Sequence, residues 1–143
     1  MLEPGSNAPA VAGNQFSQEK VLLVFFKVSC PTCQLTLPFL DRLHRSGRLA
    51  VHGVSQDGPA STGAFAKAFG LTFPMLFDRA DTRYPASNAF GITSVPSLFL
   101  VDRDRRIEWT LEGFAKKNLE ELGAAFDVPL FRAGDRVPEF KPG

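Results

Sequence analysis

The stretch VLLVFFKVSCPTC, residues 21–33, decides the fold of this chain. Its apolar, β-branched and aromatic residues lack polar alternation, which predicts a strand over 21–28 that is buried on both faces of a sheet. Apolar residues at helical spacing then continue as far as Ser46, so a helix is predicted from Pro31. The only two cysteines of the chain, Cys30 and Cys33, therefore lie where a buried strand gives way to a helix.

A Cys-x-x-Cys pair at the start of a helix predicts redox chemistry. The unpaired N–H groups and the positive end of the helix dipole stabilise a thiolate there, and can lower a thiol pKa from about 8.5 to about 3.5–7.5. Cys30 is the predicted nucleophile, and Cys33, one turn further on, is the predicted resolving thiol. Pro31 suits the first helical position, where its missing N–H costs little.

Two other uses of the cysteine pair fit the sequence less well. A zinc site needs four ligands, and the only histidines, His44 and His52, lack ligand-like spacing to the cysteines. A structural disulfide three residues apart closes too short a loop to constrain the unfolded chain much. We expect no metal, His44 on a solvated helix face, and His52 inside a strand.

The rest of the chain alternates predicted strands and helices. Pro38 should kink the first helix, and Pro74 should place its strand at a sheet edge. The order predicts an α/β fold in which a mixed central sheet has helices on both faces. The further predicted elements are strands over 49–54, 73–77, 97–101 and 106–110, a helix capped by Ser61 or Thr62 and ending at Gly70, and helices over 84–90 and 116–126.

Length and composition indicate one soluble domain over residues 1–143, with a core over about 8–126. Residues 1–18 are expected to form an extended lead-in, and residues 127–143 an extended C-terminal tail. The net charge of +1 gives no reason to expect nucleic acid or a membrane surface as a partner. The longest apolar run is far shorter than the roughly 20 residues of a membrane span, and no signal peptide is recognised. The expected location is cytoplasmic, or periplasmic if a leader has been removed.

Three further features complete a resemblance to a known family. They are Val95-Pro96 directly before a strand, Pro38 within the first helix, and Gly113-Phe114 before the last helix. With the cysteine motif, they resemble the thioredoxin superfamily, and within it the TlpA-like and ResA-like thiol-disulfide oxidoreductases that neighbour the AhpC/TSA peroxiredoxins. The resemblance covers about residues 8–126 and implies a thioredoxin-like three-layer sandwich.

The resemblance also implies a substrate site. The peptide bond before Pro96 is expected to be cis, and the backbone of Val95 to pair with a substrate chain beside the disulfide. Pro31 and Thr32, between the two cysteines, are expected to contact substrate and to tune the reduction potential.

The chain departs from the family beside the first cysteine and at the positions of the proton-accepting carboxylates. Ser29 stands where thioredoxins have Trp, and Val24 and Thr36 stand where thioredoxin and ResA-like proteins have a carboxylate. The proton acceptor for Cys33 is thus left open. Lys27 is a candidate for favouring the Cys30 thiolate, although a strand-end lysine that points to solvent is the simpler interpretation.

The sequence therefore predicts an enzyme, a monomeric thiol-disulfide oxidoreductase whose only redox group is the Cys30–Cys33 pair. Its expected partners are disulfide- or dithiol-bearing proteins and an electron-donor or electron-acceptor protein. An antioxidant thiol peroxidase is one alternative, but the family's Pro and Thr would fall at Leu23 and Lys27. A copper-chaperone or other binding module is a second alternative, although its relatives use a longer cysteine spacing and a distant histidine. The direction of exchange stays open.

Overall fold

A computed structural model describes residues 1–11 and 19–143 of the chain. Part of the expected lead-in, residues 12–18, lies outside the described residues. The strands are β1 Lys20–Phe26, β2 Ala50–Ser55, β3 Met75–Phe77, β4 Ser97–Asp102, β5 Ile107–Glu112, β6 Phe114–Ala115 and β7 Phe140–Lys141. The helices are α1 Pro31–Arg45, α2 Pro59–Phe69, α3 Pro85–Ala89 and α4 Lys116–Ala125, with a 3-10 turn at Ala80–Thr82.

Five of these strands form a sheet in the order β3-β2-β1-β4-β5. β1 pairs in parallel with β2 and antiparallel with β4, so the predicted mixed sheet is confirmed. β3 lies at the edge, as Pro74 predicted, but it is shorter than expected because only 75–77 pair with β2. β6 and β7 form a separate two-stranded sheet.

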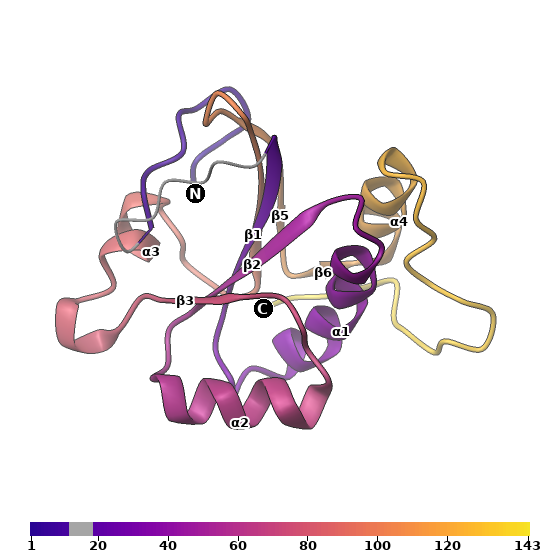
Figure 1. The fold of residues 1–143 in the computed structure, drawn as a ribbon, viewed down its shortest axis with the longest axis horizontal. Coiled ribbons are helices and arrows are strands. Elements are labelled where there is room, and N and C mark those ends of the chain that lie inside the picture. The colour runs from indigo at the N-terminus through magenta and orange to yellow at the C-terminus, as the bar shows by residue number, and fades with distance from the viewer. Residues whose placement is uncertain (12–18) are drawn as a thin grey trace.

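Alternate residues of β1 point to the two faces of the sheet. Leu22, Val24 and Phe26 belong to a core cluster that includes residues of α1, α2 and α4, whereas Leu23 and Phe25 belong to a second cluster with residues of α3 and the N-terminal segment. All five side chains are fully buried. The central position of β1, with helices on both sides, explains why its sequence is continuously apolar (Figure 1).

Helix α2 begins differently from the prediction. Ser61 or Thr62 was expected at its N-cap, but the helix starts at Pro59 after Gly58, and Gly58 provides no side-chain cap. Proline favours this start because its fixed φ angle suits the first helical position. The Thr62 hydroxyl instead forms a 2.8 Å hydrogen bond with the Ser55 hydroxyl at the end of β2.

His44 does not lie on a solvated helix face. It is half-buried, and its Nδ1 accepts a 3.1 Å hydrogen bond from the Val51 N–H, while its ring meets the edge of Phe73. His44 is drawn away from solvent because the start of β2 packs directly against the last turn of α1 and supplies a hydrogen-bond donor to the imidazole. His52 lies inside β2, as predicted.

The segment after α4 loops outward and returns to the middle of the molecule, where it ends beside β6 (Figure 1). Leu130 is buried, and the Phe131 ring lies 4.7 Å from the Phe39 ring of α1. The Arg42 guanidinium then binds the Asp135 carboxylate at 2.7 Å. These contacts hold 127–143 against the domain before its last residues form β7.

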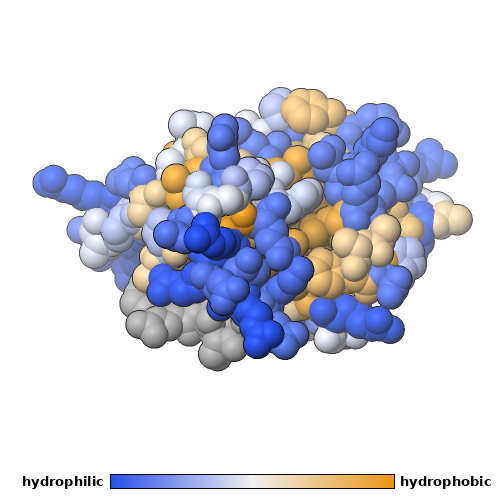
Figure 2. Space-filling view, turned by 90° about the horizontal axis from the view of Figure 1, so that it is seen from above, coloured by the Kyte–Doolittle hydropathy of each residue, from blue (hydrophilic) through white to orange (hydrophobic). Residues whose placement is uncertain are grey.

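The surface is mixed in character. Figure 2 shows hydrophilic residues over most of one face, with smaller hydrophobic areas between them. Among the described residues, the exposed large hydrophobic side chains are those of Met1, Phe69 and Phe140.

Candidate active site

The two cysteines sit at the start of α1, where the loop after β1 ends. Cys30 is the N-cap residue of the helix, with an extended backbone, and its Sγ accepts a 3.1 Å hydrogen bond from the Cys33 N–H. Both thiols are free. The Cys30 sulfur pairs with one of the N–H groups that the first turn of α1 leaves without a partner inside the helix.

The structure brings Cys30 to the predicted platform. The Cys30 thiol lies 3.4 Å from the Val95 carbonyl oxygen, to which it donates a hydrogen bond. The Val95–Pro96 peptide bond is cis, as the family resemblance predicted. Residues 65 positions apart thus meet at one end of the sheet, because β1 and β4 are neighbours.

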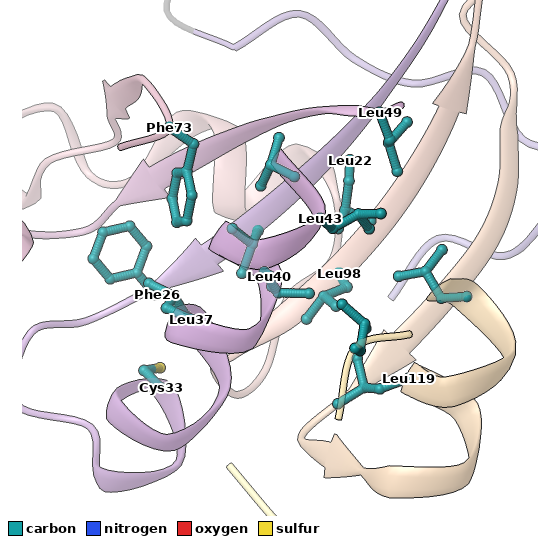
Figure 3. Close-up of a cluster of buried hydrophobic side chains, with 14 of the residues drawn as sticks. Leu22, Phe26, Cys33, Leu37, Leu40, Leu43, Leu49, Phe73, Leu98 and Leu119 are labelled. Atoms are coloured by element: carbon teal, nitrogen blue, oxygen red, sulfur yellow. The ribbon is translucent and has the colours of Figure 1, made fainter. Parts of the chain in front are cut away.

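Cys33 differs sharply from Cys30 in its surroundings. Its side chain is fully buried, whereas Cys30 is half-exposed. Figure 3 shows the Cys33 sulfur on the first turn of α1, below Leu37 and Phe26 at the margin of the core cluster. Burial strongly raises the pKa of the Cys33 thiol, and the neighbouring Cys30 and the negative charge of Asp57 raise it further. The site therefore favours the neutral thiol form of Cys33 in the reduced protein.

Asp57 is a residue of the site that the sequence reasoning missed. Its Oδ2 accepts a 2.8 Å hydrogen bond from the Val28 N–H, in the loop that leads to Cys30. Asp57 had no predicted role in the site. A signal was present, because parallel strands end at the same edge of a sheet, and Phe26 of β1 pairs with Ser55 of β2. The residues that follow the two strands therefore become neighbours.

Val24 and Thr36 occupy the two positions at which the family resemblance implied a carboxylate. Val24 and Thr36 are both fully buried. The Thr36 hydroxyl donates a 2.6 Å hydrogen bond to the Thr32 carbonyl within the helix. Neither residue offers a proton acceptor of the carboxylate type to Cys33.

Lys27 contacts the site mainly with its backbone. Its carbonyl accepts a 3.3 Å hydrogen bond from the Cys30 N–H. Its side chain is exposed and lines a cavity of about 220 Å³ that also involves Val95, Tyr84 and Gln56. The proposed influence of the Lys27 charge on Cys30 stays a prediction.

The two residues between the cysteines face different surroundings. Pro31 is exposed, but Thr32 is only 3% exposed and its hydroxyl donates a 2.6 Å hydrogen bond to the Pro142 carbonyl. The contact joins residues 110 positions apart. Nothing in the sequence of the tail indicated that it would reach the cysteine motif.

The described residues contain no group of three or more His, Cys, Asp or Glu side chains placed to hold a metal ion. Nor does this part of the chain contain a helix long and apolar enough to cross a bilayer.

A family model matches residues 4–110, and this match decides the family. The chain belongs to the AhpC/TSA family. It is 29% identical over 101 residues to the thiol-disulfide oxidoreductase ResA of Geobacillus thermodenitrificans, covering 68% of this chain and 56% of ResA. It is 32% identical over 129 residues to a putative peroxiredoxin of Mycobacterium tuberculosis, covering 74% of this chain and 82% of that protein. The predicted kinship with ResA-like proteins is confirmed.

Solved structures confirm the predicted thioredoxin-like fold. A putative thiol:disulfide interchange protein DsbE from Chlorobium tepidum has a TM-score of 0.74 at 21% identity, over 92% of this chain and all of that protein. A secreted disulfide oxidoreductase of M. tuberculosis has a TM-score of 0.62 at 16% identity, over 75% of this chain and 81% of that one. The expectation of a cytoplasmic location is contradicted, because this M. tuberculosis protein, which shares the fold, is a secreted one.

Proposed function

We propose that this chain, as a single thioredoxin-like domain, is a thiol-disulfide oxidoreductase that acts on protein substrates. The observation that carries the proposal is the position of the Cys30 sulfur. It caps α1, accepts the Cys33 N–H at 3.1 Å, and lies 3.4 Å from the carbonyl that precedes cis-Pro96. The chain spans 56% and 59% of the length of two of the ResA proteins that it resembles.

The reaction proceeds through a mixed disulfide. In the reducing direction the Cys30 thiolate attacks one sulfur of a substrate disulfide, a Cys30–substrate bond forms, and the other substrate sulfur leaves as a thiolate. Cys33 then loses its proton and attacks the Cys30 sulfur, which releases the second substrate thiolate and leaves a Cys30–Cys33 disulfide. The substrate gains two electrons and the protein loses two. A dithiol protein returns the electrons, and the same steps in reverse oxidise a substrate.

The half-exposed Cys30 and the buried Cys33 suit these two roles. A substrate sulfur can reach Cys30 from solvent, whereas Cys33 can reach only the mixed disulfide that forms beside it. Val95 and Pro96 would hold an extended substrate chain next to Cys30, and Pro31, which is exposed, would contact it. The dithiol is the only redox group that the mechanism needs, and the domain would act as a monomer with an electron-donor or electron-acceptor protein as its second partner.

Thiol peroxidase activity is the second candidate, and the 32% identity to a putative peroxiredoxin favours it. The Cys30 thiolate would attack a peroxide oxygen to give a sulfenic acid and an alcohol or water. Cys33 would then condense with the sulfenic acid, releasing water and forming the same disulfide. Leu23 and Lys27 stand at the positions of the family's Pro and Thr, and Leu23 is fully buried within β1.

The test compares insulin-disulfide reduction by the wild-type protein and by Cys30→Ser, with dithiothreitol as reductant. We expect the wild-type protein to accelerate reduction and Cys30→Ser to have no effect. Equal rates for the two proteins would end the proposal. Consumption of hydrogen peroxide by the same pair separates the candidates, because a peroxidase consumes peroxide in a Cys30-dependent way and does not accelerate insulin reduction.

A further inference from the structure

The residues Phe140–Gly143, here called the C-terminal strap, lie against the cysteine motif. β7 pairs with β6 in the register Phe114 with Lys141, and the Lys116 N–H donates a 2.9 Å hydrogen bond to the Glu139 carbonyl just before the strap. The strap is therefore seated as a strand and does not simply trail from the domain.

Two contacts place the strap on the predicted substrate platform. The Pro142 carbonyl accepts the 2.6 Å hydrogen bond from the Thr32 hydroxyl, between the two cysteines. Gly143 packs so closely on Val95 that a Cβ atom at Gly143 would collide with the Val95 carbonyl. The same carbonyl accepts the hydrogen bond from the Cys30 thiol. One backbone oxygen of the platform thus contacts both the nucleophile and the strap.

The strap packs directly against the backbone of Gly113. A Cβ atom at Gly113 would lie 2.9 Å from the Lys141 carbonyl and 3.4 Å from the Gly143 nitrogen. The Gly113 N–H is itself bonded to the Pro96 carbonyl at 2.9 Å. The absence of a side chain at this position allows the backbone of a second strand to approach the residues beside cis-Pro96.

The strap is bound through its backbone and buries little side chain. Its residues are all exposed, and Phe140 keeps 61% of its surface in solvent. Segments with few buried apolar contacts open at low free-energy cost. The strap contacts the platform through its own backbone atoms and not through its side chains. A substrate segment of different sequence could therefore take its place in an extended conformation.

We propose that the C-terminal strap is an internal competitor for the substrate platform, and that an extended protein substrate must displace it before pairing with Val95. This inference rests on the proposed oxidoreductase function and names a regulation of the same site. The half-exposed Cys30 stays open to small disulfides while the strap is seated, so the strap should slow exchange with protein chains selectively.

Replacement of Gly143 by leucine tests the proposal in the full chain. The new side chain cannot fit over the Val95 carbonyl, so Gly143→Leu should unseat the strap. Gly63→Leu is the matched control, because Gly63 is exposed in the middle of α2 and has open space around it. The measurements are the rate constants for exchange with insulin and with bis(2-hydroxyethyl) disulfide.

We expect Gly143→Leu to accelerate exchange with insulin about fivefold, which corresponds to about 1 kcal/mol, the net contribution of one hydrogen bond. Exchange with the small disulfide should change less than about twofold, and Gly63→Leu should change neither rate. An unchanged or slower insulin reaction in Gly143→Leu would overturn the proposal. Equal acceleration of both reactions would also overturn it, because the strap would then only shield Cys30.

A second readout does not depend on activity. Hydrogen exchange at the Lys116 amide reports whether the strap is seated, because its acceptor is the Glu139 carbonyl. Gly143→Leu should expose this amide to faster exchange, and unchanged protection would contradict the proposal. If the wild-type protein shows no Cys30-dependent exchange with insulin, the oxidoreductase function fails and the competitive role fails with it. If exchange with insulin depends on Cys30 but is unaltered in Gly143→Leu, only the competitive role of the strap is refuted.

Discussion

The Val28 N–H donates a 2.8 Å hydrogen bond to Asp57 Oδ2, and this bond ties the loop before Cys30 to the segment that follows β2. The carboxylate is therefore fixed beside the active site, where its negative charge contributes to the raised pKa of Cys33. One residue both shapes the loop and opposes ionisation of the resolving thiol.

Asp57→Asn should separate these two effects. The amide keeps an oxygen that can accept from Val28 but removes the charge, so the pKa of Cys33 should fall. Burial is the larger cause of the raised pKa, so resolution of the mixed disulfide should accelerate by less than the tenfold of a full pKa unit. Stopped-flow measurement of the second step of exchange provides the rate. Slower resolution would show instead that Asp57 accepts the proton of Cys33.

The sequence predicted the elements on which the site is built because their signals are local. The apolar run at 21–26 marked a buried strand, and Cys30 at its end marked a helix N-terminus. Asp57 and Pro142 escaped prediction because their positions depend on which segments become neighbours in space. Asp57 meets the motif only through the parallel pairing of β1 with β2, and Pro142 reaches Thr32 from 110 residues away through a two-residue strand without a hydrophobic pattern.

The raised pKa of Cys33 predicts that the reduced protein loses stability at alkaline pH. The folded state keeps the Cys33 proton to a higher pH than the unfolded chain, whose thiol titrates at its ordinary pKa of 9.0. This contribution to stability is therefore complete below about pH 9 and declines as pH rises further, by up to about 1.4 kcal/mol for each pH unit. Urea unfolding between pH 8 and pH 10 measures the slope.

The matched control for this slope is Cys33→Ala, which lacks the titrating thiol. The variant should be less stable at neutral pH because it loses a buried sulfur, but its stability should fall less steeply between pH 8 and pH 10. Identical slopes for Cys33→Ala and the wild-type protein would assign the alkaline loss to other groups.

Cys33→Ser should trap the mixed disulfide. Without a resolving thiol the Cys30–substrate bond persists, because Cys33 is the only other cysteine of the chain. Incubation of the reduced variant with an oxidised protein substrate should give a disulfide-linked complex. Mass spectrometry should identify this complex, and dithiothreitol should cleave it. Cys30→Ser is the control and should give none. A complex through Cys33 in that control would reverse the assigned roles.

The ion pair between Arg42 and Asp135 anchors the segment that leads to the strap, and its effect on Asp135 can be measured. The Arg42 side chain donates to Asp135 at 2.7 Å and the Arg132 N–H donates at 2.6 Å, and these bonds lower the pKa of the Asp135 carboxyl to about 2. Its stabilising effect is present above the unfolded-chain value of 3.8 and is lost as pH falls towards 2. Arg42→Ala should therefore raise the pKa of Asp135 towards 3.8, as carboxyl titration by NMR can measure. Arg45→Ala is the control, since Arg45 lies on the same helix but binds Asp41, and it should leave the titration of Asp135 unchanged. A similar rise in both variants would indicate a general loss of positive charge and not a specific anchor.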